Sequence, residues 1–254
     1  MKDRLGEINI NNQGEQMKII EYIDAKNIKV LFLNTSNIVK SRYSHFKEGS
    51  IKDYMYPSVL NIGYLGTPNK VNTKDYSYRC WMGMLDRCYG GTDKNPTYED
   101  VTVCEEWLNY SKFKQWFDIN YYEIEGESVQ LDKDLLLKGN KIYCPKFCCF
   151  LPKIINEAII DNKKKKNSKN VDIPIGVNPH GDKFQCSIRK YGKQYFIGTY
   201  NSIEEASKIY NAEKENYIKE LADKYKKYIT EESYNALKKY KMGEEDSYDK
   251  RINQ

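Results

Sequence analysis

Two neighbouring stretches near the C-terminus constrain the fold most strongly, because their side chains alternate. In Lys183–Arg189 every second residue is apolar, and the run Lys193–Tyr200 follows after a short Gly-containing break. A period of two is typical of strands whose two faces differ, and such a break is typical of a hairpin. Ser202 with Glu205 then fits a capping box, so we expect a helix from Ser202 to about Tyr225. The pattern predicts a small antiparallel sheet with one face packed on a helix.

The other face of this predicted sheet carries polar and basic side chains. In its first long strand these are Lys183, Gln185, Ser187 and Arg189. Such a sheet can enter the major groove, where arginine and glutamine pair with base edges and lysine contacts phosphate. The net charge of +5 permits a nucleic-acid partner without requiring one. Double-stranded DNA is therefore the predicted partner of this face.

The same segment resembles the Apetala-2/ethylene-response-factor DNA-binding domain. The residues that carry the resemblance are Gly176-Val177, Phe184, Ile188-Arg189, Ile197-Gly198-Thr199-Tyr200, Glu204-Glu205-Ala206 and Asn211-Ala212. The resemblance implies a three-stranded antiparallel sheet whose outer face reads DNA. Carried over position by position, the contacts are Asn178, His180, Lys183, Gln185, Ser187, Arg189, Gln194 and Phe196. Asn178 and His180 replace two arginines of the family, and Phe196 replaces a tryptophan, so the family's sequence preference does not carry over.

The middle of the chain resembles HNH-like endonucleases of phages and mobile elements that carry the same DNA-binding domain. The shared pattern is Trp81-x-x-Met84-x-x-Arg87-Cys88, Val103-Cys104-x-x-Trp107, Leu131-Asp132-Lys133-Asp134 and Gly139-Asn140-x-x-Tyr143-x-Pro145-x-x-Cys148-x-Phe150. The resemblance implies two strands and a helix that grip one Mg²⁺ ion. It also implies hydrolysis of a DNA phosphodiester in the manner of a homing endonuclease.

The resemblance also assigns roles within that unit. Asp132 and Asn156 would hold the metal, with Asp134 as an alternative ligand on the same strand face, and Asn140 would orient the base or the attacking water. Lys133 stands at the position of the general base. A lysine is normally protonated at pH 7 and repels a metal ion, so it is a poor base there.

Two functions from different classes therefore remain open. The retained Asp132, Asn140 and Asn156 favour a metal-dependent DNA nuclease. Lys133 favours a catalytically inactive phage factor that binds DNA or a host defence protein, as a regulator or as an inhibitor of a defence such as CRISPR. A weaker third alternative is an architectural DNA-packaging protein.

Histidine and cysteine bear on the same question. The chain has two histidines, His45 and His180, and neither lies between residues 73 and 162, so an HNH-like unit here would lack its usual base. The seven cysteines are odd in number and include no Cys-x-x-Cys pair. Buried free thiols are therefore favoured over a structural zinc site or a disulfide framework.

Hydrophobic spacing predicts the remaining elements. Helices are expected over Tyr78–Tyr89 and Glu105–Phe117, and a third over Pro152–Ile160 after two short strands between Gln130 and Leu151. A further helix is expected after Thr230. At helical spacing the tryptophans are interpreted as core residues rather than as stacking platforms.

The chain is thus predicted to be an α+β protein of three parts. Residues 1–72 form a small SH3-like β-unit with strands near Lys18–Ile23 and Lys29–Leu33, residues 73–162 the HNH-like unit, and residues 171–242 the DNA-binding domain.

Two connecting segments complete the division. Residues 163–170 are a Lys-rich linker, in which Lys163, Lys164, Lys165 and Lys166 are candidate phosphate contacts, and residues 243–254 are a flexible tail. No apolar run is long enough to cross a bilayer, and the first residues lack the apolar stretch of a signal peptide. The cytoplasm of an infected bacterial cell is the expected compartment, with no membrane partner.

Overall fold

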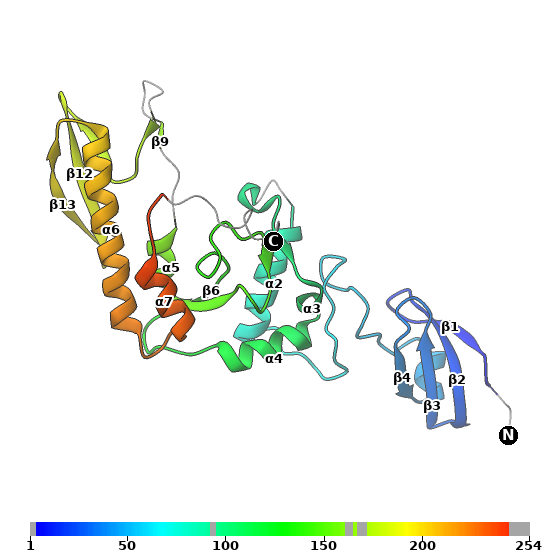
Figure 1. Cartoon of the computed structure of the whole chain (residues 1–254). Coiled ribbons are helices and arrows are strands. Elements are labelled where there is room, and N and C mark those ends of the chain that lie inside the picture. The colour runs from blue at the N-terminus through cyan, green and yellow to red at the C-terminus, as the bar shows by residue number, and fades with distance from the viewer. Residues whose placement is uncertain (1–3, 92–94, 161–164, 167–171, 244–254) are drawn as a thin grey trace, which may run out of the picture. The chain divides into compact units, whose positions relative to one another are not determined.

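The computed structural model describes residues 4–91, 95–160, 165–166 and 172–243 (Figure 1). Helices and several small sheets follow one another along the chain, which confirms the predicted α+β class. The chain divides into two compact units, residues 1–119 and residues 120–254, which are described separately below. Within the described residues, no helix is both long and apolar enough to span a membrane. The predicted three-part division stays a prediction.

The first unit begins with a four-stranded antiparallel meander. Its strands pair in the order β1-β2-β3-β4 and are followed by a short helix; they are β1 (Ile8–Ile10), β2 (Gln16–Asp24), β3 (Asn27–Phe32), β4 (Ile38–Ser41) and α1 (Tyr43–Lys47). Alternate residues of β2 and β3, among them Met17, Ile19 and Val30, are fully buried against Phe46 of α1. The predicted strands overlap β2 and β3, because the alternating pattern that marked them is the pattern of this core.

Helices form the rest of the first unit. They are α2 (Tyr76–Tyr89), the 3₁₀ helix η1 (Pro96–Tyr98), α3 (Glu105–Leu108) and α4 (Tyr110–Asn120), with the short strand β5 (Thr102–Val103) before α3. The single helix predicted over Glu105–Phe117 is wrong, because the chain is extended at Asn109. There the Oδ1 of Asn109 accepts a hydrogen bond from the backbone N–H of Ser111. Trp81 and Trp107 are fully buried, which confirms their interpretation as core residues.

The second unit opens with two paired strands and a helix. These are β6 (Val129–Asp132), β8 (Cys149–Pro152) and α5 (Lys153–Ile159), with β7 (Ile142–Tyr143) in the connection between β6 and β8. The β6–β8 pair is antiparallel and aligns Asp132 with Cys149. The helix predicted over Pro152–Ile160 is confirmed, with Pro152 at its N-cap.

A three-stranded antiparallel sheet and two helices complete the second unit. They are β11 (Val177–His180), β12 (Lys183–Lys190), β13 (Lys193–Tyr200), α6 (Ile203–Tyr225) and α7 (Glu231–Lys239), preceded by the two-residue pair β9 (Lys165–Lys166) and β10 (Asp172–Ile173). The predicted hairpin and both helices are confirmed. Ser202 caps α6 by accepting a hydrogen bond from the backbone N–H of Glu205 at 3.1 Å.

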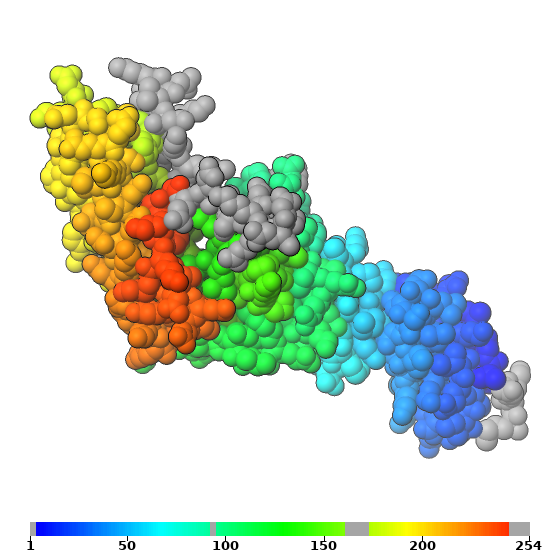
Figure 2. Space-filling view, viewed as in Figure 1, coloured from blue at the N-terminus to red at the C-terminus, as the bar shows by residue number. Residues whose placement is uncertain are grey.

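One hydrophobic core runs through the whole second unit. Leu151 and Ile155 from the β6–β8–α5 segment belong to the same buried cluster as Cys186 of the sheet, Leu221 of α6 and Leu237 of α7. In the space-filling view the orange and red atoms of α6 and α7 adjoin the green atoms of this segment (Figure 2). The strand-and-helix motif and the three-stranded sheet are therefore stabilised together.

Candidate nucleic-acid interface

The register of β11, β12 and β13 brings all eight predicted DNA contacts onto one face. Antiparallel pairing aligns Asn178 with Gln185 and His180 with Lys183. On the other side of β12 it aligns Ser187 with Phe196 and Arg189 with Gln194. Because directly opposed residues point to the same face of a sheet, these eight side chains form a continuous surface, called the outer face below.

A β-bulge adds one residue that simple alternation misses. The register shifts between Cys186 and Ser187, so that Ile197 is the extra residue of β13. Alternation from Gln194 and Phe196 would place Gly198 next on the outer face. Beyond the bulge the two faces are exchanged, so that Thr199, which is aligned with Gln185, lies on the outer face in place of Gly198. Thr199 is exposed and joins the outer face.

The outer face is open and only lightly bonded to itself. Phe196 is 62% exposed, although a phenylalanine of this kind is ordinarily buried. Gln194 donates to the hydroxyl of Ser187 at 2.6 Å, and the Nε of Arg189 donates to the carbonyl of Gly192 at 3.2 Å. The remaining guanidinium N–H groups of Arg189 and the ammonium of Lys183 face a solvated surface, where a base edge or a phosphate can replace water.

The opposite face of the sheet explains the glycine in the Gly176-Val177 motif. Val177, Cys186 and Ile188 are buried against α6, which contributes Tyr210 to the same core. Gly176 has φ +76°, and a Cβ added there would lie 2.1 Å from the ring of Tyr210. Only glycine satisfies both the backbone conformation and this close approach, so the motif is the means by which β11 meets the helix.

Four of the predicted nuclease residues lie at the end of β6 or in the connection that follows it, and three of these, Asp132, Lys133 and Asn140, are buried. Asp132 is 8% exposed, and its Oδ1 accepts hydrogen bonds from the backbone N–H groups of Asp134 at 3.1 Å and Leu135 at 2.8 Å. Burial raises the pKa of Asp132 to about 6, and the nearby charge of Asp134 acts in the same direction. Asp132 therefore terminates the strand with a turn.

Lys133 and Asn140 bond to each other's backbone across this connection. The ammonium of Lys133 donates to the carboxylate of Asp134 and to the carbonyl of Asn140, both at 2.7 Å. The amide of Asn140, which is fully buried, donates to the carbonyls of Lys133 and Ile142 and accepts from the N–H of Ile142. The two side chains hold the connection closed, and the groups predicted to act as base and orienting residue are engaged in this role.

Asn156 is not brought to the same place as the two aspartates. Its amide donates to the Oε1 of Gln130 at 2.9 Å. A pocket of about 250 Å³ is lined by Asp132 and Asp134, and on the helix side its lining residues are Ile159 and Ile160. The predicted third oxygen ligand is thus replaced by isoleucine. The pocket thus supplies two carboxylates, and that of Asp134 is paired with Lys133. The predicted Mg²⁺ ion stays a prediction.

The cysteines fall into two groups by burial. Cys148, Cys149 and Cys186 are buried, and the other four are partly exposed; all seven are free thiols. Burial holds the pKa of Cys148 and Cys149 well above its ordinary value, so both are neutral packing groups at pH 7. Within the described ranges no three His, Cys, Asp or Glu side chains gather in a metal-binding arrangement.

The predicted linker contacts fall largely outside the described residues. Lys163 and Lys164 lie outside them, and of Lys165 and Lys166 only the backbone is described, as strand β9. Their phosphate contacts stay a prediction.

Comparisons with models of protein families, with curated protein sequences and with solved structures found no match to this chain.

Proposed function

We propose that the chain is a double-stranded DNA-binding protein that reads the major groove with the outer face and does not cleave the DNA. The observation that carries the proposal is the register that gathers nine outward-pointing side chains, mostly polar or basic, with the exposed Phe196 among them. Arg189 and Gln194 are directly opposed. Arg189 can donate to both O6 and N7 of guanine, and Gln194 can donate to N7 of adenine and accept from its N6–H₂ group. Lys183, at the start of β12 and on the same face, is suited to a flanking phosphate.

The non-catalytic part of the proposal is supported by the way in which the β6–β8 connection uses its side chains. Lys133 and Asn140 are engaged with each other's backbone, and Asn156 with Gln130. For Lys133 to act as a base, its ammonium would have to lose a proton while it is paired with the carboxylate of Asp134. The connection is therefore proposed to be a structural element that supports the core beneath the sheet.

Binding is tested with the full chain and a fluorescent duplex selected from a random-sequence pool, measured by anisotropy. Arg189→Ala is expected to weaken binding about tenfold or more, since a base-contacting arginine contributes roughly 1–3 kcal/mol, and to relax preference at one base pair. Lys208→Ala removes the same charge from an exposed position of α6 and is the matched control. Equal, small effects of both variants would refute the outer face as the reader.

Cleavage is tested with supercoiled plasmid in Mg²⁺ or Mn²⁺ buffer. We expect no nicked product from the chain. Two results together would overturn the non-catalytic part of the proposal and restore the nuclease. Asp132→Ala would abolish nicking, and Arg189→Ala would reduce nicking only as far as it reduces DNA binding. Asp132 and Asp134 line the same pocket, and this observation is the reason to test the nuclease alternative.

A further inference from the structure

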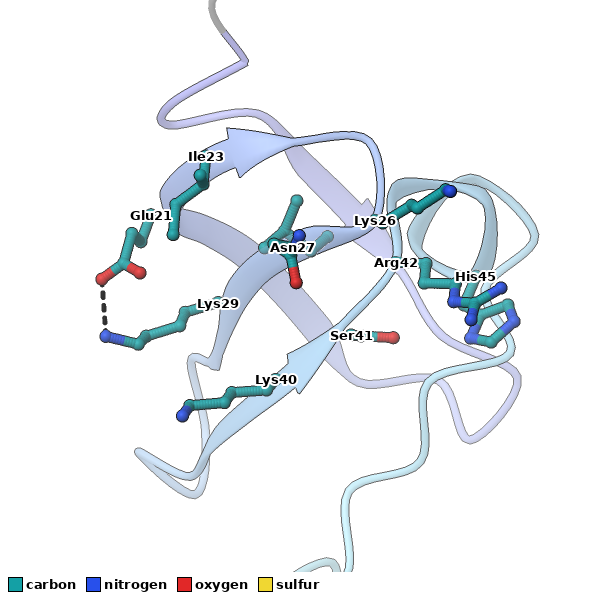
Figure 3. Close-up of a pocket in the computed structure, with 10 residues that line it drawn as sticks. Glu21, Ile23, Lys26, Asn27, Lys29, Lys40, Ser41, Arg42 and His45 are labelled. Atoms are coloured by element: carbon teal, nitrogen blue, oxygen red, sulfur yellow. Dashed lines mark hydrogen bonds and ion pairs between the residues drawn. The ribbon is translucent and has the colours of Figure 1, made fainter.

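A groove on the N-terminal meander concentrates positive charge. It has a volume of about 510 Å³ and is formed by β2, β3, β4 and the start of α1 (Figure 3). Among its ten lining residues, Lys26, Lys29, Lys40 and Arg42 carry positive charge and Glu21 alone carries negative charge, with His45 beside Arg42. The chain as a whole carries only +5 over 254 residues, so this density is a local property of the groove.

The sheet register places these cations on neighbouring strands. Lys29 of β3 is aligned with Glu21 of β2 on one side and with Lys40 of β4 on the other. Figure 3 shows Lys29 and Lys40 extending toward one side of the groove, and Lys26 and Arg42 on the opposite side. Cations on both sides of a groove produce a field that is focused between them.

The acids near the groove are already engaged. Glu21 pairs with Lys29 at 2.5 Å. Asp24, the last residue of β2, accepts hydrogen bonds from the amide of Asn27 and the backbone N–H of Lys26, which lower the pKa of its carboxyl. The hydroxyl of Ser41 lies between the two cationic sides and is a neutral hydrogen-bonding group, whereas the amide of Asn27 already donates to Asp24.

The lining chemistry fits a phosphate backbone better than a protein. Binding hot spots between proteins are centred on aromatic or large apolar side chains in pockets. The ten lining residues include no Phe, Tyr or Trp, and their exposed apolar side chain is Ile23. Without aromatic rings the groove has no platform for stacking on bases. Its cations and the hydroxyl of Ser41 match phosphodiester oxygens, which are read without regard to sequence.

We infer that the N-terminal groove is a second, sequence-independent DNA contact that binds the phosphate backbone. The inference rests on the proposed function, because it assigns the groove and the outer face to the same ligand. Two contacts in one chain make the second binding event intramolecular, so that each contact can be weak while the whole chain binds tightly.

The test measures the salt dependence of binding of the full chain to a duplex long enough for both contacts. Each phosphate neutralised by Lys or Arg contributes about 0.9 to the slope of log K against log salt. The variant Lys29→Gln, Lys40→Gln and Arg42→Gln is expected to lower this slope by about 2 to 3 and to weaken binding equally for preferred and unrelated sequences. The matched control is Lys47→Gln, Lys74→Gln and Lys112→Gln, which removes the same charge from exposed positions of the same unit.

A single substitution that is expected to tighten DNA binding distinguishes the loss of charge from a folding defect. Glu21→Gln removes the acid that pairs with Lys29 and is expected to tighten binding about two- to fivefold while raising the slope by about 1. A misfolded meander cannot produce tighter binding.

The outcomes separate this inference from the proposed function. If the chain binds DNA through Arg189 but the groove variant has the slope of the control, the groove inference is overturned and the outer face stands. Polyglutamate serves as a model of an acidic protein. If the groove variant keeps the salt slope of DNA binding but no longer binds polyglutamate, the groove inference is also overturned, in favour of an acidic protein partner. If the unaltered chain binds no duplex at low salt, both fall together.

Discussion

The outer face of β11–β12–β13 and the connection between β6 and β8 carry similar polar side chains and use them in opposite ways. On the outer face Arg189 and Lys183 point to solvent, with few bonds to the protein. In the connection, Lys133 and Asn140 are buried and bond to each other's backbone. Polar groups that are satisfied internally define a structure, whereas polar groups left to water can exchange that water for a ligand. The sequence resemblance assigned function to both regions, and the geometry supports it for the sheet.

The largest expected effect is the loss of stability when the hydrogen bonds of the β6–β8 connection are removed. Asn140→Ala removes three hydrogen bonds, which join its buried side chain to the backbone of Lys133 and Ile142, so we expect the second unit to lose about 3–4 kcal/mol of stability. Hydrogen exchange of the α6 amides measures this loss. The control is Asn178→Ala on the outer face, expected to change stability by less than about 0.5 kcal/mol. Similar effects of both variants would contradict the contrast between the two regions.

The next effect is a pH dependence carried by Asp132. Its pKa is raised from 3.8 to about 6 in the fold, so the folded state binds the proton more tightly than the unfolded state. The contribution of Asp132 to the free energy of unfolding of the second unit is therefore fully present below pH 4. This contribution falls by about 2–3 kcal/mol as the pH rises through 6. Asp132→Asn should remove this part of the dependence. Stability curves of the two proteins that remain parallel from pH 4 to 7 would show that Asp132 is not the titrating group.

A smaller expected effect, on DNA binding, tests which face of β13 contacts the DNA. Phe196→Ala is expected to weaken binding about tenfold with unchanged stability, because the ring is largely exposed before binding. Tyr195→Ala alters an aromatic residue of the adjacent position, which is aligned with buried Ile188 on the opposite face. It should change affinity by less than about twofold. A larger loss from Tyr195→Ala than from Phe196→Ala would invert the assignment of faces.

The smallest expected effect tests the bulge. Thr199→Val keeps the side-chain volume and removes the hydroxyl, and we expect a loss of about two- to fivefold in affinity for the preferred sequence. The measurement is the same anisotropy titration, with an unrelated duplex as the reference. If the preferred duplex loses no more affinity than the unrelated one, Thr199 makes no base contact.

The sheet and its helix could be predicted because local rules and the tertiary fold agree there. Alternation in Lys183–Arg189, the Gly-containing turn and the Ser202 cap each predicted the element that formed. The bulge at Ile197 was not predictable, since it depends on strand pairing and leaves no mark in the alternation. As a result Thr199 was missed, although it belongs to the Ile197-Gly198-Thr199-Tyr200 motif; its place in that motif was the signal available.

The nuclease residues show the limit of reading roles from positions. The sequence placed Asp132, Asn140 and Asn156 in the right elements, at the end of a strand, in a connection and on a helix. It could not show that Asn156 lies beside Gln130 while Ile159 and Ile160 line the pocket of Asp132, because a helix of about two turns presents its residues in different directions. It also gave no sign that Lys133 is buried, which depends on how the connection closes over it.

The shared core of the second unit has a consequence for the order in which the protein is made. Leu237 of α7 is fully buried with Leu151 of β8, and the hydroxyl of Tyr240 donates to the carbonyl of Ile159. A ribosome therefore releases the meander of the first unit early enough for it to fold during synthesis. The second unit has to wait with β6, β8 and α5 exposed until α7 has left the exit tunnel. A pause in translation between residues 160 and 230 would prolong the period in which those apolar strands are open to aggregation or to a chaperone.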